Sequence, residues 1–287
     1  MPTSSGHSPA PSPSWTRVYR VLRHPAPAAE ERVLLVAAHP DDETIGAGAR
    51  LELLPNLRIL HLTDGAPLER RWWGDPTLAT REVYARFRRR ELEAALALAG
   101  VGPGQLRTLG ITDQCASEDL VALTRAMRDE IAEWAPSVIL THPYEGGHPD
   151  HDAAAFAVHA ACRALRAVSG GAPLVVEFAC YHLATDGTLR TGAFLGRSAA
   201  TLRLTAEQRE RKKQMLACFR TQQRTLSPFG ISVERFRPAP AYDFSDPPHA
   251  GRLHYEQFDW GITGEEWQVR AEAALRALGL AGTGPRR

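Results

Sequence analysis

Residues 32–43 read Arg-Val-Leu-Leu-Val-Ala-Ala-His-Pro-Asp-Asp-Glu, and this stretch decides the fold class. Its first half is a continuous apolar run without period-two alternation, which is typical of a strand covered on both faces in a parallel sheet. Its second half changes to proline and acidic residues, a pattern that begins a helix. We therefore predict a buried strand that ends near residue 38, followed by a helix over 43–54.

The same strand-helix unit recurs along the chain. Further strands are predicted at 57–62, 106–109, 137–141 and 174–182, and further helices at 80–99, 118–134, 149–168 and 205–220. Such alternation implies right-handed crossovers and a doubly wound sheet. The expected fold is a single Rossmann-like α/β domain, with a mostly parallel sheet and helices on both faces. Prolines and aromatic residues after residue 221 predict an irregular C-terminal layer.

The composition is globular, with 44% hydrophobic and 23% charged residues in a chain of 287. Lys and Arg total 34 against 33 for Asp and Glu, so the charge balance favours neither nucleic acid nor an anionic membrane as a partner. The four cysteines form no C-x-x-C pair and are expected to be reduced. A small-molecule partner fits best, and a homo-oligomer is compatible with these data.

Residues 1–20 begin with a stretch rich in proline and serine that lacks the apolar centre of a secretory signal. No later run is long enough and apolar enough to span a bilayer. We expect a disordered tail over 1–20, one domain over 21–287 and a cytoplasmic location.

Two short segments carry residues suited to chemistry. The first is 38–43, Ala-His-Pro-Asp-Asp-Glu, and the second is 146–152, Gly-Gly-His-Pro-Asp-His-Asp, which follows the strand predicted at 137–141. The carboxyl ends of parallel strands meet at one edge of a sheet, and ligands bind there. In each His-Pro-Asp the proline can be the first helical residue, which holds its neighbours on a rigid turn.

Two imidazoles and a carboxylate on this rim, those of His39, Asp42 and His151, suit a zinc ion. Three protein ligands leave an open position for water, as catalytic zinc requires. Asp41 is the nearest carboxylate that could take the proton from that water. A charged imidazole next to the metal could stabilise the oxyanion of an amide under attack, and His148, partnered by Asp150, fits this role.

Each segment alone also has a purely structural explanation. Asp41 and Asp42 can be acids at a helix N-terminus, and His148 and His151 can cap a turn. Both segments, however, place His and Asp at a strand-helix junction on the same edge. The pair therefore favours a metal site.

Together the two segments resemble the marks of the LmbE-like, or PIG-L, family of zinc-dependent N-acetylglucosaminyl de-N-acetylases. The looser resemblance extends from about Val33 to Phe229. It implies one zinc ion per chain, with ferrous iron as the alternative in the cell. It implies the following site residues: His39, Asp42 and His151 as metal ligands, Asp41 as the general base, His148 as the residue that polarises the acetyl carbonyl, and Asp150 as its orienting partner.

The resemblance also implies two substrate-binding residues, Arg88 and Asp113. Arg88 shares a helical stripe with apolar Tyr84 and Leu92, so it needs a partner, such as Glu91, an acidic rim residue or the sugar. The alternative is a surface arginine with a buried stem. Asp113 resembles an aspartate that contacts a sugar hydroxyl, although a turn-forming role is an equal alternative.

Two further features leave alternatives open. Some family members carry a mobile tyrosine two residues before the first histidine of the second motif, where this chain has Gly146. Tyr144 is a candidate substitute. Trp72 and Trp73 could stack on a sugar face or simply pack on their own domain.

We therefore predict a zinc-dependent N-deacetylase, a hydrolase of a linear amide, that acts on an N-acetylglucosamine-type sugar in a small glycoconjugate. One alternative is metal-dependent hydrolysis of a non-sugar amide; phosphoester chemistry often uses two metals and more carboxylates than this rim offers. The other is a non-catalytic sugar-binding or nucleotide-binding protein on the same fold. Asp41 argues against loss of catalysis, and the first turn lacks a G-x-G-x-x-G run.

Overall fold

Strand β1 (Val33–Ala37) lies inside the main sheet, and its side chains alternate between two hydrophobic cores. Val33, Leu35 and Ala37 belong to one core, and Leu34 and Val36 to the other. Both faces of the strand are therefore buried, which is why its sequence is continuously apolar.

The structure, a computed structural model, describes residues 31–54, 56–196 and 200–281, together with Trp15, Thr16, Tyr19 and Leu22. Apart from Trp15, Thr16 and Tyr19, the tail predicted at 1–20 lies outside the described residues. Trp15 and Leu22 are buried against the same core as Val33.

The main sheet has seven strands in the order β3-β2-β1-β4-β5-β9-β8. Strands β1 to β5 run parallel, and β9 and β8 add an antiparallel edge. A separate pair is formed by β6 and β7. The bounds are β2 (Leu57–Pro67), β3 (Leu106–Asp113), β4 (Val138–Thr141), β5 (Leu174–Phe178), β6 (Tyr181–Leu183), β7 (Leu189–Thr191), β8 (Ala200–Arg203) and β9 (Val233–Pro238).

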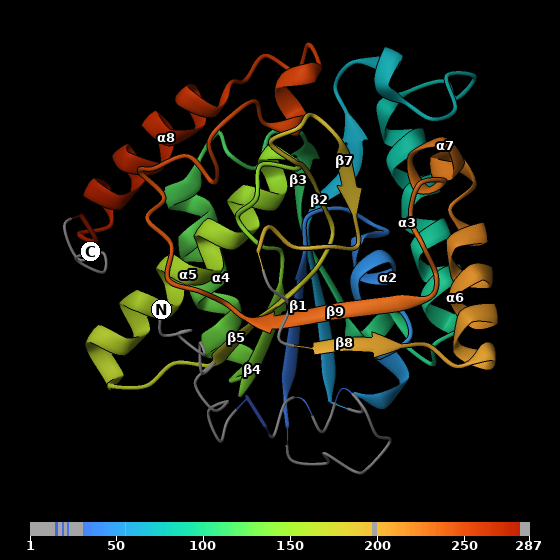
Figure 1. Ribbon diagram of the computed structural model, residues 1–287, viewed down its shortest axis with the longest axis horizontal. Helices are drawn as coiled ribbons and strands as arrows, with labels where there is room; N and C mark the ends of the chain where they lie inside the picture. Colours follow the sequence, from blue (N-terminus) through green and yellow to red (C-terminus); the bar gives the residue numbers. More distant parts are fainter. Residues whose placement is uncertain are drawn as a thin grey trace, which may run out of the picture.

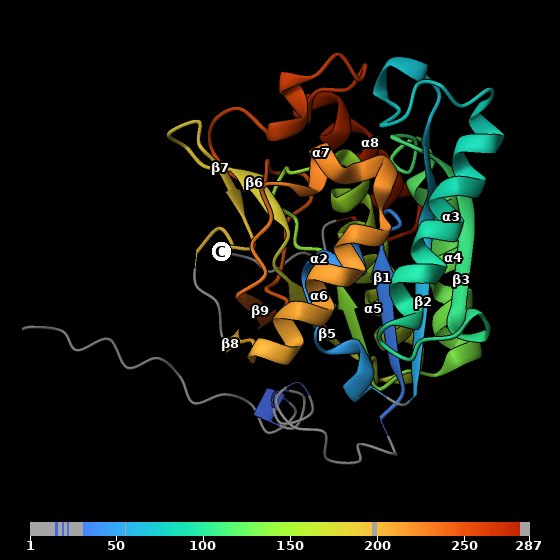
Figure 2. The same cartoon turned by 90° about the vertical axis from the view of Figure 1, so that its right-hand side faces the viewer.

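Helices cover both faces of the sheet, as predicted (Figure 1; Figure 2). The helices on one face are α2 (Asp42–Ala47), α3 (Arg81–Ala97) and α6 (Ala206–Cys218). Those on the other are α4 (Leu120–Trp134), α5 (Pro149–Ser169) and α8 (Gly264–Ala277). The short elements are α7 (Gln223–Leu226) and the 3-10 turns η1 (Leu51–Leu53), η2 (Arg70–Trp72), η3 (Pro103–Gln105), η4 (Arg220–Gln222) and η5 (His254–Gln257).

The strand order places the segments 38–43 and 146–152 at the same edge of the sheet. The order reverses between β1 and β4, because the chain runs from β1 outward to β2 and β3 and then returns to the other side of β1. Ligands bind outside the carboxyl ends of the strands at such a switch point. The segment 38–43 follows β1, and the segment 146–152 follows β4.

The C-terminal part is more regular than predicted. The expected irregular layer after residue 221 contains β9, which pairs with β5 and β8, and α8, a helix of 14 residues. The helix has a buried stripe formed by Trp267, Ala271 and Ala274. The helix predicted over 43–54 is also shorter than expected, because α2 ends at Ala47 and a 3-10 turn follows.

Candidate active site

A cleft of about 370 Å³ opens beside the ends of β1 and β4. The residues that line it and were predicted as site residues are His39, Asp41, Asp42, Arg88, Asp113 and His148. Segments distant in sequence complete the lining, including Gln222 and Arg224 and an aromatic stretch around Phe258. A cleft of this size suits a small ligand.

The three predicted metal ligands lie together around the Asp42 carboxylate. His39 Nδ1 is 3.2 Å from Asp42 Oδ2, and His151 Nε2 is 3.2 Å from Asp42 Oδ1. Tetrahedral zinc ligands at about 2.1 Å from the metal lie about 3.4 Å from one another. His151 Nε2 is also buried without a hydrogen bond in the described part of the chain. The donor types, their distances to Asp42 and the free nitrogen fit a zinc ion. Among the described residues, His151 and Asp42 belong to one group of potential metal-binding side chains, and His39 belongs to the adjacent group with Asp113, His148 and Asp150.

Two side chains that the sequence analysis did not single out, His142 and Cys180, adjoin the same carboxylate. Together with Asp42 and His151 they form a group whose potential metal-binding atoms lie within 4.8 Å of one another. His142 Nε2, however, accepts a hydrogen bond from Ala38 N at 3.1 Å, and its ring stacks on His151 at 4.0 Å. Since this nitrogen is engaged, His142 supports the site by packing.

Cys180 also contacts Asp42. Its thiol donates to Asp42 Oδ1 at 3.8 Å, and burial raises the pKa of the thiol well above its usual range. Cys180 therefore contacts Asp42 as a neutral thiol. A histidine or cysteine directly at a strand end was the sequence signal that could have identified both residues.

Asp41 has the most unusual backbone of the site, with φ 124° at a residue that is not glycine. Such conformations are strained and persist where the surroundings hold them. Glu43 accepts a hydrogen bond from Asp41 N at 3.1 Å, and His61 lies 3.0 Å from the same Glu43 oxygen. Burial raises the pKa of Asp41 to about 7, while the positive charge of Arg88 opposes the rise.

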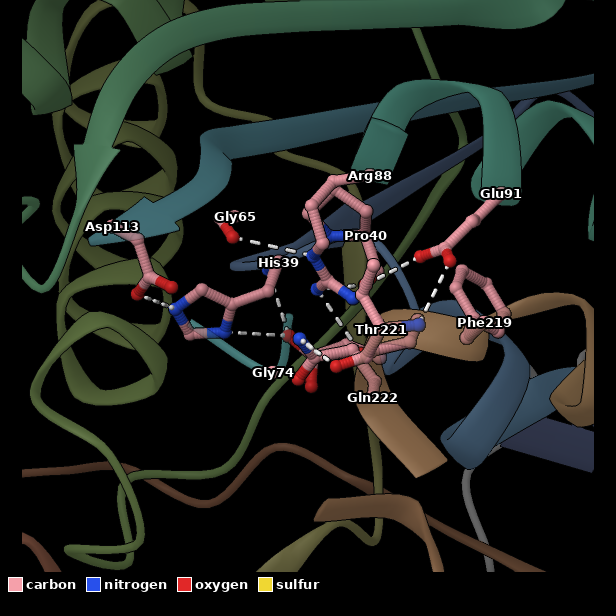
Figure 3. Close-up of polar contacts among 12 residues, drawn as sticks. His39, Pro40, Gly65, Gly74, Arg88, Glu91, Asp113, Phe219, Thr221 and Gln222 are labelled. Carbon is pink, nitrogen blue, oxygen red and sulfur yellow. Dashed lines mark hydrogen bonds and ion pairs between the residues drawn. The ribbon is translucent and has the colours of Figure 1, made fainter. Parts of the chain in front are cut away.

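Arg88 is buried, and it points from α3 toward Pro40 (Figure 3). Its Nη2 donates to Pro40 O at 2.6 Å and to Asp41 Oδ2 at 3.1 Å, and its Nε donates to Gly65 O at 3.2 Å. Of the three partners considered from sequence, the acidic rim residue is therefore observed. Nη1 is buried and has no hydrogen bond among the described residues, and the Arg88 side chain also lines the cleft.

Gly65 leaves room for the Arg88 side chain, whereas Glu91 contacts a different segment. Gly65 has φ +66°, and a Cβ there would lie 2.8 Å from Arg88 Nε, so only glycine permits this approach. Glu91, the other partner considered, instead accepts hydrogen bonds from Thr221 N at 2.8 Å and from Thr221 Oγ1 at 2.6 Å. Glu91 thus fixes the segment that leads to Gln222 in the cleft wall.

His148 is the N-cap residue of α5, and its Nδ1 accepts from Asp150 N at 3.1 Å. The proton of the neutral ring is therefore on Nε2. Burial lowers the pKa of His148 to about 3, and the charge of His39 adds to the effect. His148 is thus a neutral donor in this structure and not the charged imidazole that was expected.

Asp150 makes its main contacts elsewhere. Its Oδ2 lies 3.1 Å from His39 Nε2 and accepts from Gln114 N at 2.7 Å, whereas His148 Nδ1 is 3.9 Å away. The side-chain pair expected between His148 and Asp150 therefore has no hydrogen bond. Asp150 orients His39, as carboxylates commonly do for a metal-binding histidine.

Asp113 lies at the end of β3, on the same rim. Its Oδ1 is 3.0 Å from His39 Nε2 and 3.9 Å from His148 Nε2. Burial raises the pKa of Asp113, but the neighbouring positive charges, that of His39 foremost, together with the hydrogen bond from His39 lower it to about 2. Asp113 is thus a charged side chain in the cleft, close to both histidines.

Gly146 occupies the position at which some family members carry a mobile tyrosine. It has φ +69°, and a Cβ there would lie 2.7 Å from Leu253 Cδ2, so Leu253 fills the space beside it. Tyr144, the candidate substitute for the family tyrosine, is buried, and its hydroxyl donates to Asp246 O at 3.0 Å. Tyr144 does not line the cleft, whereas Tyr181 does.

Trp72 and Trp73 differ in environment: Trp73 packs inside its own domain, and Trp72 faces the cleft. Trp73 is buried and stacks on Tyr84 at 5.3 Å, and its Nε1 donates to Pro67 O at 2.9 Å. Trp72 lines the cleft.

Comparison with known proteins agrees with this geometry. Residues 34–162 match the model of the GlcNAc-PI de-N-acetylase (PIG-L) family. A probable N-acetyl-alpha-D-glucosaminyl L-malate deacetylase 2 of Bacillus anthracis is 32% identical over 162 residues, which cover 55% of this chain and 71% of that protein. The chain belongs to this family.

Two further relatives define how far the likeness extends. The protein of the same name from Bacillus subtilis is 36% identical over 133 residues, 45% of this chain and 59% of that protein. The A40926 pseudoaglycone deacetylase Dbv21 shares the fold, with a TM-score of 0.55, 24% identity, and coverage of 72% of this chain and 96% of that chain. The chain thus spans between half and three fifths of the length of the first curated relatives. In the described part of the chain, no helix combines the length and apolar character needed to cross a bilayer.

Proposed function

We propose that this chain is a zinc-dependent N-deacetylase that removes the acetyl group from an N-acetylglucosamine-type sugar in a small glycoconjugate. His39, Asp42 and His151 would hold the ion. When bound, zinc would polarise the acetyl carbonyl and make a water molecule more acidic. The products would be acetate and a free amine.

The other residues divide the proton chemistry between them. Arg88 holds the Asp41 carboxylate next to Asp42, where it can take a proton from the attacking water and return that proton to the departing nitrogen as the amide bond breaks. His148 can donate its Nε2 proton toward the carbonyl oxygen as negative charge develops there. Asp150 keeps His39 in place through the nitrogen that faces away from Asp42.

One observation carries the proposal: a candidate base on a strained turn lies directly beside a group of donors that fits a metal. Asp41 has φ 124°, and Arg88 and Glu43 hold it there. Strain of this kind collects at functional sites. The names of the relatives, which describe deacetylation of glucosaminyl conjugates, support the sugar as the substrate class.

The test is acetate release by the zinc-loaded protein from a panel of N-acetylglucosamine conjugates and from N-acetyl-lysine as a non-sugar amide. The proposal predicts release from at least one sugar conjugate, loss of release after chelation, and recovery when zinc is restored. Release from N-acetyl-lysine alone would indicate that the substrate is a non-sugar amide and not a sugar conjugate. Sugar binding without any release would point to the non-catalytic alternative.

A further inference from the structure

Three aromatic side chains form one wall of the cleft beside His148. Trp260 lies 4.7 Å from the His148 ring, and Phe258 stacks on Trp260 at 4.6 Å with 15° between their planes. Trp72 meets both Phe258 and Trp260 edge-on at 6.1 Å. All three line the cleft, and we call Trp72, Phe258 and Trp260 the aromatic wall.

The aromatic wall joins two segments that are far apart in the chain. Figures 1 and 2 show both at the upper end of the molecule, the cyan-blue segment near residue 70 and the orange-red segment near residue 258. Arg71 Nη2 forms an ion pair with Asp259 Oδ2 at 3.0 Å, which links the two segments outside the cleft. The residues from 258 to 260 lie beyond the part of the chain that matches the family model.

The wall is attached to the loop that carries His148. His254 N donates to Gly146 O at 2.9 Å, and His254 Nδ1 lies 3.1 Å from Gly147 O. Leu253 packs against Gly146, where only a glycine leaves room for it. The position of the wall relative to His148 is therefore built into the fold.

The chemistry of the wall favours a particular kind of ligand. Its ring faces are apolar, but the indole nitrogens of Trp72 and Trp260 are buried and have no hydrogen bond within the described residues. Unpartnered buried donors are rare. A ring with an apolar face would stack on the wall. After a small rotation of an indole, oxygen atoms at the edge of that ring would accept a hydrogen bond from the indole N–H.

We propose that the aromatic wall is the subsite for the group attached to the acetylated sugar, and that it selects conjugates in which this group is a ring with an apolar face. This inference rests on the proposed function, because the proposed role of His148 places the acetamide next to Trp260. The wall continues from Trp260 to Phe258 and Trp72, so the next group of the substrate lies along it. An acyclic dicarboxylate such as malate has no face to stack.

One residue in the cleft favours a different occupant. Arg224 also lines the cleft, and its guanidinium would favour an anionic group. A malate conjugate is therefore the competing substrate that the experiment must compare. Ring conjugates come in three kinds, a cyclitol, a second pyranose and an aryl group, which the same experiment separates.

The experiment measures kcat/KM for acetate release from N-acetylglucosamine and from its conjugates with inositol, a second N-acetylglucosamine, phenol and malate. The variants are Trp72→Ala, Phe258→Ala and Trp72→Phe, and the matched control is Phe87→Ala, an exposed aromatic on α3 outside the cleft. We expect the wild type to prefer a ring conjugate. The alanine variants should lose about tenfold on ring conjugates and less than about twofold on N-acetylglucosamine, the scale of one aromatic contact. Trp72→Phe should retain most of the preference.

A second readout does not depend on turnover. In Asp41→Asn, binding of the preferred ring conjugate should change tryptophan fluorescence, and adding Phe258→Ala should weaken that binding about tenfold. Equal losses on ring and malate conjugates, or a wild type that prefers malate, would overturn the subsite while leaving the deacetylase proposal intact. Fluorescence binding that depends on Phe258, without acetate release from any conjugate, would support the subsite and contradict the proposed function.

Discussion

The guanidinium of Arg88 contacts both the backbone and the side chain of the turn at Asp41, with Nη2 donating to Pro40 O at 2.6 Å and to Asp41 Oδ2 at 3.1 Å. Through these two bonds a residue of α3 holds a strained residue that follows β1. Arg88 is therefore a positioning residue for Asp41.

Arg88→Met is expected to reduce kcat for acetate release about 10²-fold with an unchanged metal content, because Asp41 would move out of place. Arg88→Lys should not restore activity, since one ammonium group cannot make the same set of bonds. Arg89→Met is the control, because Arg89 pairs with Glu93 on the same helix and does not line the cleft. Loss of metal in Arg88→Met, or an equal loss of activity in Arg89→Met, would contradict this role.

His151→Ala should lose the metal and the activity together, because His151 Nε2 is the free donor beside Asp42. His142→Ala should keep most of the metal, because His142 Nε2 is occupied by Ala38 N. Metal content per chain, measured by elemental analysis after dialysis, separates the two. Loss of metal from His142→Ala with retention in His151→Ala would reverse the assignment.

His159, on α5, provides a test of pH-dependent stability away from the active site. Its ring lies 5.1 Å from Tyr242, and its Nε2 is buried without a hydrogen bond in the described residues. Burial, together with the positive charges of Arg166 and Arg163, lowers the pKa of His159 to about 4. The unfolded chain, with a histidine pKa of about 6.5, binds more protons between these two values, so stability falls as the pH falls through this range.

The contribution of His159 to the free energy of unfolding should fall by about 2 kcal/mol between neutral pH and pH 5. His159→Gln should therefore lose less stability than the wild type over the same interval. Urea unfolding at the two pH values measures both losses. If the variant and the wild type lose the same amount, the His159 ring is not shielded from protons in the folded state.

Gly146→Ala is expected to lower the free energy of unfolding by about 1–3 kcal/mol, the usual cost of a side chain added to a filled space. Its φ of +69° and the nearness of Leu253 both oppose a side chain. Urea unfolding checks this value. Gly104→Ala, where a Cβ would meet nothing within 4 Å, is the control and should change stability far less.

The sequence allowed prediction of the features that depend on local pattern. The apolar run before His39 marked the central strand, and the strand order brings the two motifs to one switch point. The sequence could predict Asp41 only as one of several possible partners of Arg88, because the two residues are 47 positions apart. The helical stripe showed that Arg88 is buried but not what it contacts.

Other features had no local signal. Strand β9 reads Val-Glu-Arg-Phe-Arg-Pro, with two adjacent charged residues and a terminal proline, so its sequence does not predict a strand, and its pairing with β5 depends on the tertiary structure. The aromatic wall joins Trp72 to residues near 260, and no spacing rule connects them. The bond from Asp150 to His39 likewise depends on how the two loops meet.

The most direct test of the central claim is to measure metal content and acetate release in Asp41→Asn beside the wild type. If Asp41 is the general base and not a ligand, the variant should bind the same amount of zinc and lose about 10²–10⁴-fold in kcat. A variant that loses its metal, or one that keeps both metal and wild-type activity, would contradict the account.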